Sequence, residues 1–133
     1  MASITAVGLP PREATRLRKS GVRTTDGLLR VAATKSGRRK LAGRTKLPER
    51  EVLGWVNRAD LMRVKGIGPE YADLLEAAGV DTVKELRTRN SNNLLETMSD
   101  LNARKRLVRR LPTIGMVDGW VGAAKDLEPM VRY

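Results

Sequence analysis

Two runs of basic side chains are the groups in this 133-residue sequence best suited to chemistry, and neither run contains an Asp or a Glu. The first basic run consists of Lys35, Arg38, Arg39, Lys40, Arg44 and Lys46, and the second of Arg104, Lys105, Arg106, Arg109 and Arg110. Guanidinium and ammonium groups at this density suit phosphate, and each phosphate neutralised adds about one unit to the salt dependence of binding. We therefore expect a polyanionic partner.

The composition excludes most catalytic chemistry. The chain has no Cys and no His, which removes thiolate nucleophiles, disulfides, the usual general base and the commonest zinc ligand. Lys and Arg number 26 against 15 Asp and Glu, a formal net charge of +11. We expect a protein that is not an enzyme, has no cofactor or metal and takes no small-molecule substrate.

Membrane insertion and secretion are not expected either. No apolar run approaches the ~20 residues that a membrane span needs. Residues 1–7 lack the charged start and apolar centre of a secretory signal. We therefore expect a cytoplasmic protein.

The sequence is internally repeated. Gly8-Leu9-Pro10-Pro11 aligns with Gly66-Ile67-Gly68-Pro69, and the two tryptophans, Trp55 and Trp120, fall at equivalent places further on. We predict two copies, residues 1–60 and 61–133, which adjoin without a linker. The first copy has fourteen Lys and Arg against five Asp and Glu, and the second has twelve against ten.

The apolar residues recur at helical spacing, which predicts an all-α fold. Expected helices begin at Pro11 and Pro69 and stop at Gly21 and Gly79, and a Thr82–Glu85 capping box opens the next one. Later helices are predicted at 48–58 and 113–126, with Trp55 and Trp120 in the core. Shorter basic helices are predicted at about 36–42 and 101–109.

The segment from Leu61 to Leu75 resembles the helix-hairpin-helix motif. It has an apolar residue, a Gly66-Ile67-Gly68 turn, Ala72 four residues after the second Gly, and an apolar pair beyond. The resemblance implies two tandem helix-hairpin-helix (SAM-like) domains of four to five short helices each. The whole chain is also similar to an uncharacterised bacterial family of tandem helix-hairpin-helix-like domains.

The superfamily implies sequence-independent binding of double-stranded DNA through phosphates. In this chain the implied backbone cradle is Lys65, Gly66 and Gly68, where the start of a helix offers free N–H groups. Some members also hold a monovalent cation on the hairpin carbonyls, which makes one possible at Gly66–Gly68. The first copy departs from the motif because Pro10 replaces the second Gly, and in the second copy Glu70 would repel phosphate.

Two functions remain open. The first is non-catalytic binding of double-stranded DNA by the two basic runs together with Lys65, Gly66 and Gly68, in a nucleoid-associated protein that bridges or bends DNA. The second is a protein-interaction scaffold of the same fold, favoured by the acidic residues Glu70, Asp73 and Glu76. An enzyme using Lys65 as a Schiff-base nucleophile is the least favoured, because no partner Asp is found.

Overall fold

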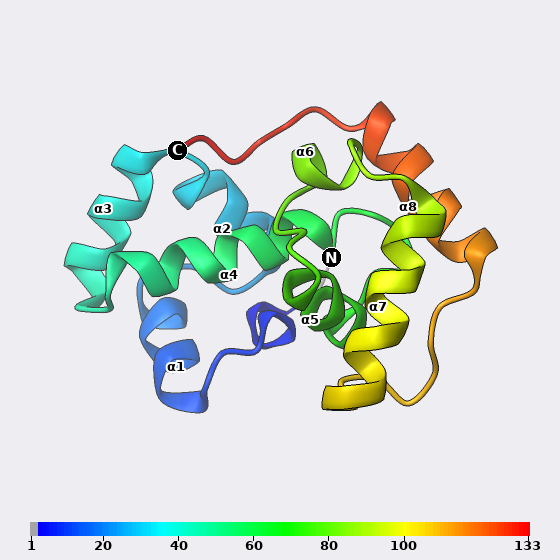
Figure 1. Cartoon of the computed structure of the whole chain (residues 1–133). Coiled ribbons are helices and arrows are strands. Elements are labelled where there is room, and N and C mark those ends of the chain that lie inside the picture. Colours follow the sequence, from blue (N-terminus) through cyan, green and yellow to red (C-terminus); the bar gives the residue numbers. More distant parts are fainter. Residues whose placement is uncertain (1–2) are drawn as a thin grey trace. The chain divides into compact units, whose positions relative to one another are not determined.

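The computed structural model describes residues 3–133, and every regular element in that range is helical (Figure 1). In chain order the elements are the 3-10 helix η1 (Ile4–Val7) and the α-helices α1 (Pro11–Lys19), α2 (Thr25–Ala32), α3 (Lys35–Thr45), α4 (Glu49–Leu61), α5 (Pro69–Ala77), α6 (Val83–Leu86), α7 (Ser91–Lys105) and α8 (Ile114–Asp126). Extended pairing within the described range is a single isolated bridge between Ser3 and Thr24. The predicted all-α class is confirmed.

The chain divides into two compact units. The first contains the described residues up to Asp60 together with Met130–Tyr133, and the second is Leu61–Pro129. The predicted second copy, residues 61–133, included these last four residues. The structure places them with the first unit, because the Arg132 amide donates to the Ala33 carbonyl at 2.8 Å and Val131 is buried.

This division sharpens the charge asymmetry. The first unit has fifteen Lys and Arg against five Asp and Glu, and the second has eleven against ten. Polyanion attraction is therefore expected to be stronger at the first unit.

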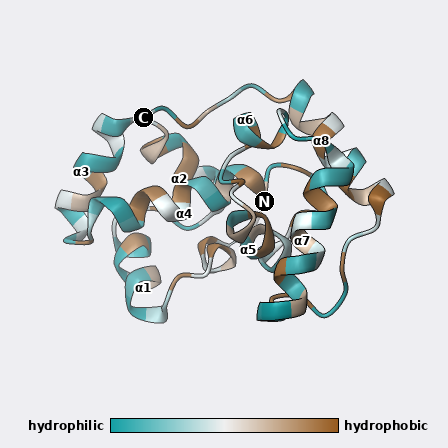
Figure 2. Cartoon of the chain, in the orientation of Figure 1, coloured by the Kyte–Doolittle hydropathy of each residue, from teal (hydrophilic) through white to brown (hydrophobic). Residues whose placement is uncertain are grey.

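Each unit has its own apolar core. In the first unit the fully buried side chains include Leu17, Leu28, Leu41 and Val52, and in the second α5, α6, α7 and α8 pack around Leu74, Leu75, Met98 and Val117. Figure 2 shows the apolar residues as short bands along the helices, separated by hydrophilic ones. Trp120 lies in the core as predicted, whereas Trp55 is only half-buried.

The same backbone signals shape both units. Gly21 and Gly79 both have φ +88°, and the amide that follows each returns to a helix carbonyl at 2.9 Å, Val22 to Leu17 and Val80 to Leu75. This is the left-handed stop expected of glycine after a helix. It confirms the predicted ends of α1 and α5.

Thr24 and Thr82 also act alike, since each caps the next helix through its side-chain oxygen. The Glu85 amide donates to the Thr82 hydroxyl at 3.3 Å, as the predicted capping box requires, and the Glu85 carboxylate accepts hydrogen bonds from Arg89, with Nη2 at 2.8 Å.

The basic helices differ from the prediction. The first, expected at 36–42, is the longer α3. The prediction of a second basic helix at 101–109 is wrong. The helix here, α7, begins at Ser91 and ends at Lys105, and Arg106 has φ +49°. The Val108 amide bonds to the Asn102 side-chain oxygen at 2.9 Å, so the chain leaves the helix there.

Two glycines in α3 have opposite environments. A Cβ built at Gly37 would lie 2.1 Å from the Val31 carbonyl oxygen, so glycine is what lets α3 approach α2. A Cβ at Gly43 would meet nothing within 4 Å. Gly37 is therefore required by packing, and Gly43 is not.

We predict opposite stability changes for alanine at these positions. Gly43→Ala raises the free energy of unfolding by about 0.5–1 kcal/mol, because alanine loses less backbone entropy in a helix. Gly37→Ala lowers it by about 1–3 kcal/mol through overpacking. Urea unfolding followed by circular dichroism measures both, and equal effects would contradict this packing.

Candidate nucleic-acid interface

The first basic run lies on α3 of the first unit. Thr34 caps this helix by accepting a hydrogen bond from the Gly37 amide at 3.0 Å, and Lys46 ends it with φ +58°. The face that points inward carries Arg38, Leu41 and Thr45. The remaining cations of the run are exposed: Lys35, Arg39, Lys40, Arg44 and Lys46.

Arg38 is a correction to the predicted interface. Its side chain is only 3% exposed, and its guanidinium donates to three carbonyls: those of Ala32 at 3.1 Å, Ala33 at 2.8 Å and Arg132. A group engaged in this way is a structural anchor, so we remove Arg38 from the phosphate-binding set.

An open groove of about 490 Å³ runs beside the exposed cations. Its lining comes from the end of α2 and one side of α3: Val31, Gly37, Arg39, Lys40, Gly43 and Arg44. Val31 is one of the exposed large apolar side chains, at 39%. The groove therefore combines three uncharged residues, Val31, Gly37 and Gly43, called its apolar floor below, with three positive charges.

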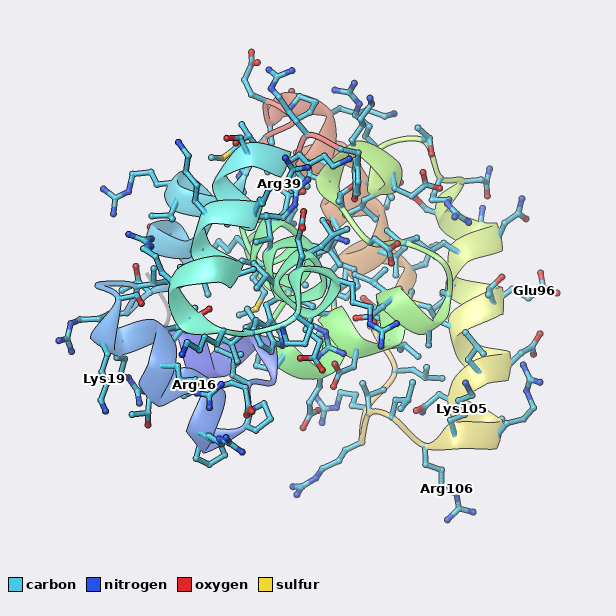
Figure 3. All side chains as sticks on the ribbon, turned by 90° about the vertical axis from the view of Figure 1, so that its left-hand side faces the viewer. Arg16, Lys19, Arg39, Glu96, Lys105 and Arg106 are labelled. Atoms are coloured by element: carbon cyan, nitrogen blue, oxygen red, sulfur yellow. The ribbon has the colours of Figure 1, made fainter. Side chains whose placement is uncertain are left out.

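Other cations of the first unit lie outside the predicted run. Arg16 and Lys19 project from α1 (Figure 3). Arg58 of α4 reaches the end of η1, where its Nη1 donates to the Val7 carbonyl at 3.5 Å. Sequence reasoning missed Arg58 because about fifty residues separate it from Val7, and no local pattern marks such a contact.

The second basic run lies at the end of α7 and in the loop that follows. Arg104 and Lys105 occupy the last helical turn, where cations complement the helix dipole. All five cations of the run are exposed, and Figure 3 shows Lys105 and Arg106 at the end of the helix.

Aromatic side chains connect this loop to the Gly66-Ile67-Gly68 hairpin. A Cβ built at Gly66 would lie 3.1 Å from Trp120 Nε1, and the Trp120 and Tyr71 rings are 5.1 Å apart. The Tyr71 hydroxyl then donates to the Arg110 carbonyl at 3.1 Å. The loop and the hairpin are thus held on one side of the second unit.

The two hairpin glycines have different roles. Gly66 has φ +94°, which glycine adopts without strain. Gly68 is extended, with φ −98°, and a Cβ there would meet nothing within 4 Å. Gly68 precedes α5 without a side-chain cap, and Lys65 beside it is exposed.

Glu70 shares an open depression with cations of the second basic run. The depression measures about 670 Å³, and its charged lining residues are Glu70, Arg106 and Arg109. An anion placed there gains two guanidinium groups and is repelled by one carboxylate. We therefore expect phosphate to bind at the loop cations more strongly than at the start of α5.

Two carbonyls at the hairpin already accept hydrogen bonds. The Val64 carbonyl accepts from the Ile67 amide at 3.1 Å, and the Gly68 carbonyl accepts from the Ala72 amide at 2.9 Å. The monovalent cation expected at Gly66–Gly68 stays a prediction.

Two other kinds of site are absent from residues 3–133. No group of three or more Asp or Glu is placed to hold a metal ion. No helix in this range has both the length and the apolar character of a membrane span.

The fold and this surface define an all-helical protein of two compact units, each with an exposed basic run. Residues 7–127 match the family described as Domain of unknown function (DUF4332), and the chain belongs to this family. No solved structure matches the chain.

We predict that Arg38 and Arg39 differ sharply in their effect on stability. Arg38→Met removes the guanidinium donor from three carbonyls, of which Ala33 keeps the Arg132 amide, and lowers the free energy of unfolding by about 2–4 kcal/mol. The neighbouring Arg39→Met, on the exposed face, changes it by no more than about 0.5 kcal/mol. Urea unfolding compares the two variants, and a small effect of Arg38→Met would refute its anchoring role.

Proposed function

We propose that this protein binds double-stranded DNA through phosphate contacts, without catalysis and with little reading of bases. The observation that carries the proposal is that each unit presents an acid-free basic run whose cations, Arg38 apart, are exposed: along α3 in the first unit, and at the end of α7 and in the following loop in the second. Both helices end in a basic residue at positive φ, Lys46 and Arg106. Ordered cations without neighbouring acids in the run are suited to a regular polyanion.

The proposal includes the fold family. We infer that the two units are helix-hairpin-helix repeats, because the left-handed glycines and the threonine caps recur at matching positions. The hairpin of Lys65, Gly66 and Gly68 would then contribute backbone amides beside the loop cations. Gly68 supports this role, since neither its φ nor its surroundings require glycine for folding.

Two separate basic surfaces in one chain suggest what DNA binding would achieve. They would engage two segments of one duplex and bend it, or two duplexes and bridge them. We propose that it acts as a nucleoid-associated protein in the bacterial cytoplasm.

The second candidate is a protein-interaction scaffold. The exposed Glu70 carboxylate in the depression beside Arg106 and Arg109 favours it, since a mixed-charge surface suits a protein partner better than DNA. A partner recovered equally well after nuclease treatment would support this candidate.

Removing two charges from the first basic run tests DNA binding. We predict that Arg39→Gln with Lys40→Gln weakens duplex binding and lowers the slope of log K against log salt by about two units. Fluorescence anisotropy with a short duplex at several salt concentrations gives both quantities.

A matched control removes two exposed charges outside both runs, with Lys84→Gln and Lys125→Gln. This pair is expected to leave the slope nearly unchanged. Equal effects of the two pairs would show only a general charge attraction, and no binding by the unaltered protein at low salt would refute the proposed function.

A further inference from the structure

We propose that the groove between α2 and α3 seats the sugar–phosphate backbone of one DNA strand. The apolar floor of the groove contacts the sugars. The cations that line the groove bind the phosphates that flank each sugar. This inference rests on the proposed function. It adds to the phosphate contacts an apolar contact between the groove and the sugars.

Gly43 lines this groove and is the position from which a side chain could fill it. It lies inside α3, where glycine costs about 1 kcal/mol relative to alanine, and it is exposed. Gly37 lies about 9 Å away along the same helix, at the usual rise per residue, and is required by the Val31 carbonyl. Nothing lies within 4 Å of a Cβ at Gly43, so the protein itself makes no use of this space.

The chemistry of the lining defines what would enter. Val31, Gly37 and Gly43 make a floor without charge, and Val31 is left 39% exposed there. Arg39, Lys40 and Arg44 bring three positive charges to the same groove. The matching ligand is uncharged in its middle and anionic at intervals along its length.

A DNA strand has this pattern, because sugars alternate with phosphates. Lys40 and Arg44 are one helical turn apart, about 6 Å along the axis, and neighbouring phosphates of a strand are separated by a comparable distance. An acidic peptide fits less well, since its polar amides would lie on the apolar floor without hydrogen-bond partners.

The test fills the groove without changing any charge. We predict that Gly43→Leu weakens binding of a short DNA duplex about tenfold and leaves the slope of log K against log salt unchanged. Leucine is a better helix former than glycine, so circular dichroism and thermal unfolding should show an intact fold.

The matched control is Gly54→Leu, a glycine-to-leucine change in the interior of α4. Gly54 is also exposed, with nothing within 4 Å of a Cβ. This variant is expected to bind the duplex as the unaltered protein does. Equal weakening by both variants would overturn the assignment to the groove.

The remaining outcomes separate this inference from the proposed function. Unchanged binding by Gly43→Leu, with weaker binding by the Arg39→Gln, Lys40→Gln pair, overturns the groove and leaves DNA binding standing. Absence of duplex binding by the unaltered protein at low salt overturns both. A parallel titration with poly-L-glutamate completes the test, because a stronger Gly43→Leu effect on the peptide than on DNA would make the groove a peptide site.

Discussion

The basic surface of the first unit depends on the buried guanidinium of Arg38. It binds the carbonyls of Ala32 and Ala33, where α2 ends, and places a positive charge at the negative end of that helix. The same group binds the carbonyl of Arg132, so the last residues of the chain are held at this corner. With Gly37 against the Val31 carbonyl, this contact fixes α3 on α2. One cation of the run is therefore used for folding, and the others are left exposed on an ordered helix.

The second unit supports its cations differently. Its second basic run continues past α7 into a loop, and ordering that loop costs conformational entropy. The Asn102 side chain accepts from the Val108 amide, and the Tyr71 hydroxyl donates to the Arg110 carbonyl. Tyr71 in turn packs on Trp120, which lies against Gly66. The scarce aromatic residues thus hold the loop beside the hairpin, although their sequence positions indicated only a core role.

Much of the fold could be predicted because its signals are local. Proline at Pro11 and Pro69 marks helix starts, Gly21 and Gly79 mark stops, and the apolar spacing indicates the all-α class. The features that sequence reasoning missed depend on long-range contacts or on side-chain direction. Adjacent arginines such as Arg38 and Arg39 look alike in a sequence, and only packing shows which one points inward. The end of α7 was predicted too far along the chain. The Val108 amide donates to the Asn102 side chain and not to a helix carbonyl, and no local pattern marks this bond. The groove beside Gly43 has no sequence signature, since glycine also occurs where packing demands it, as at Gly37.

The central claim is that polyanion binding is localised on the two basic runs. Titration of ¹⁵N-labelled protein with a short DNA duplex, followed by amide chemical shifts, measures this directly. We predict that the largest shifts fall in residues 35–46 and 104–110 and at the amides of 65–68. Shifts concentrated instead on the acidic face of α5 and the middle of α7, or no shifts at low salt, would contradict the account.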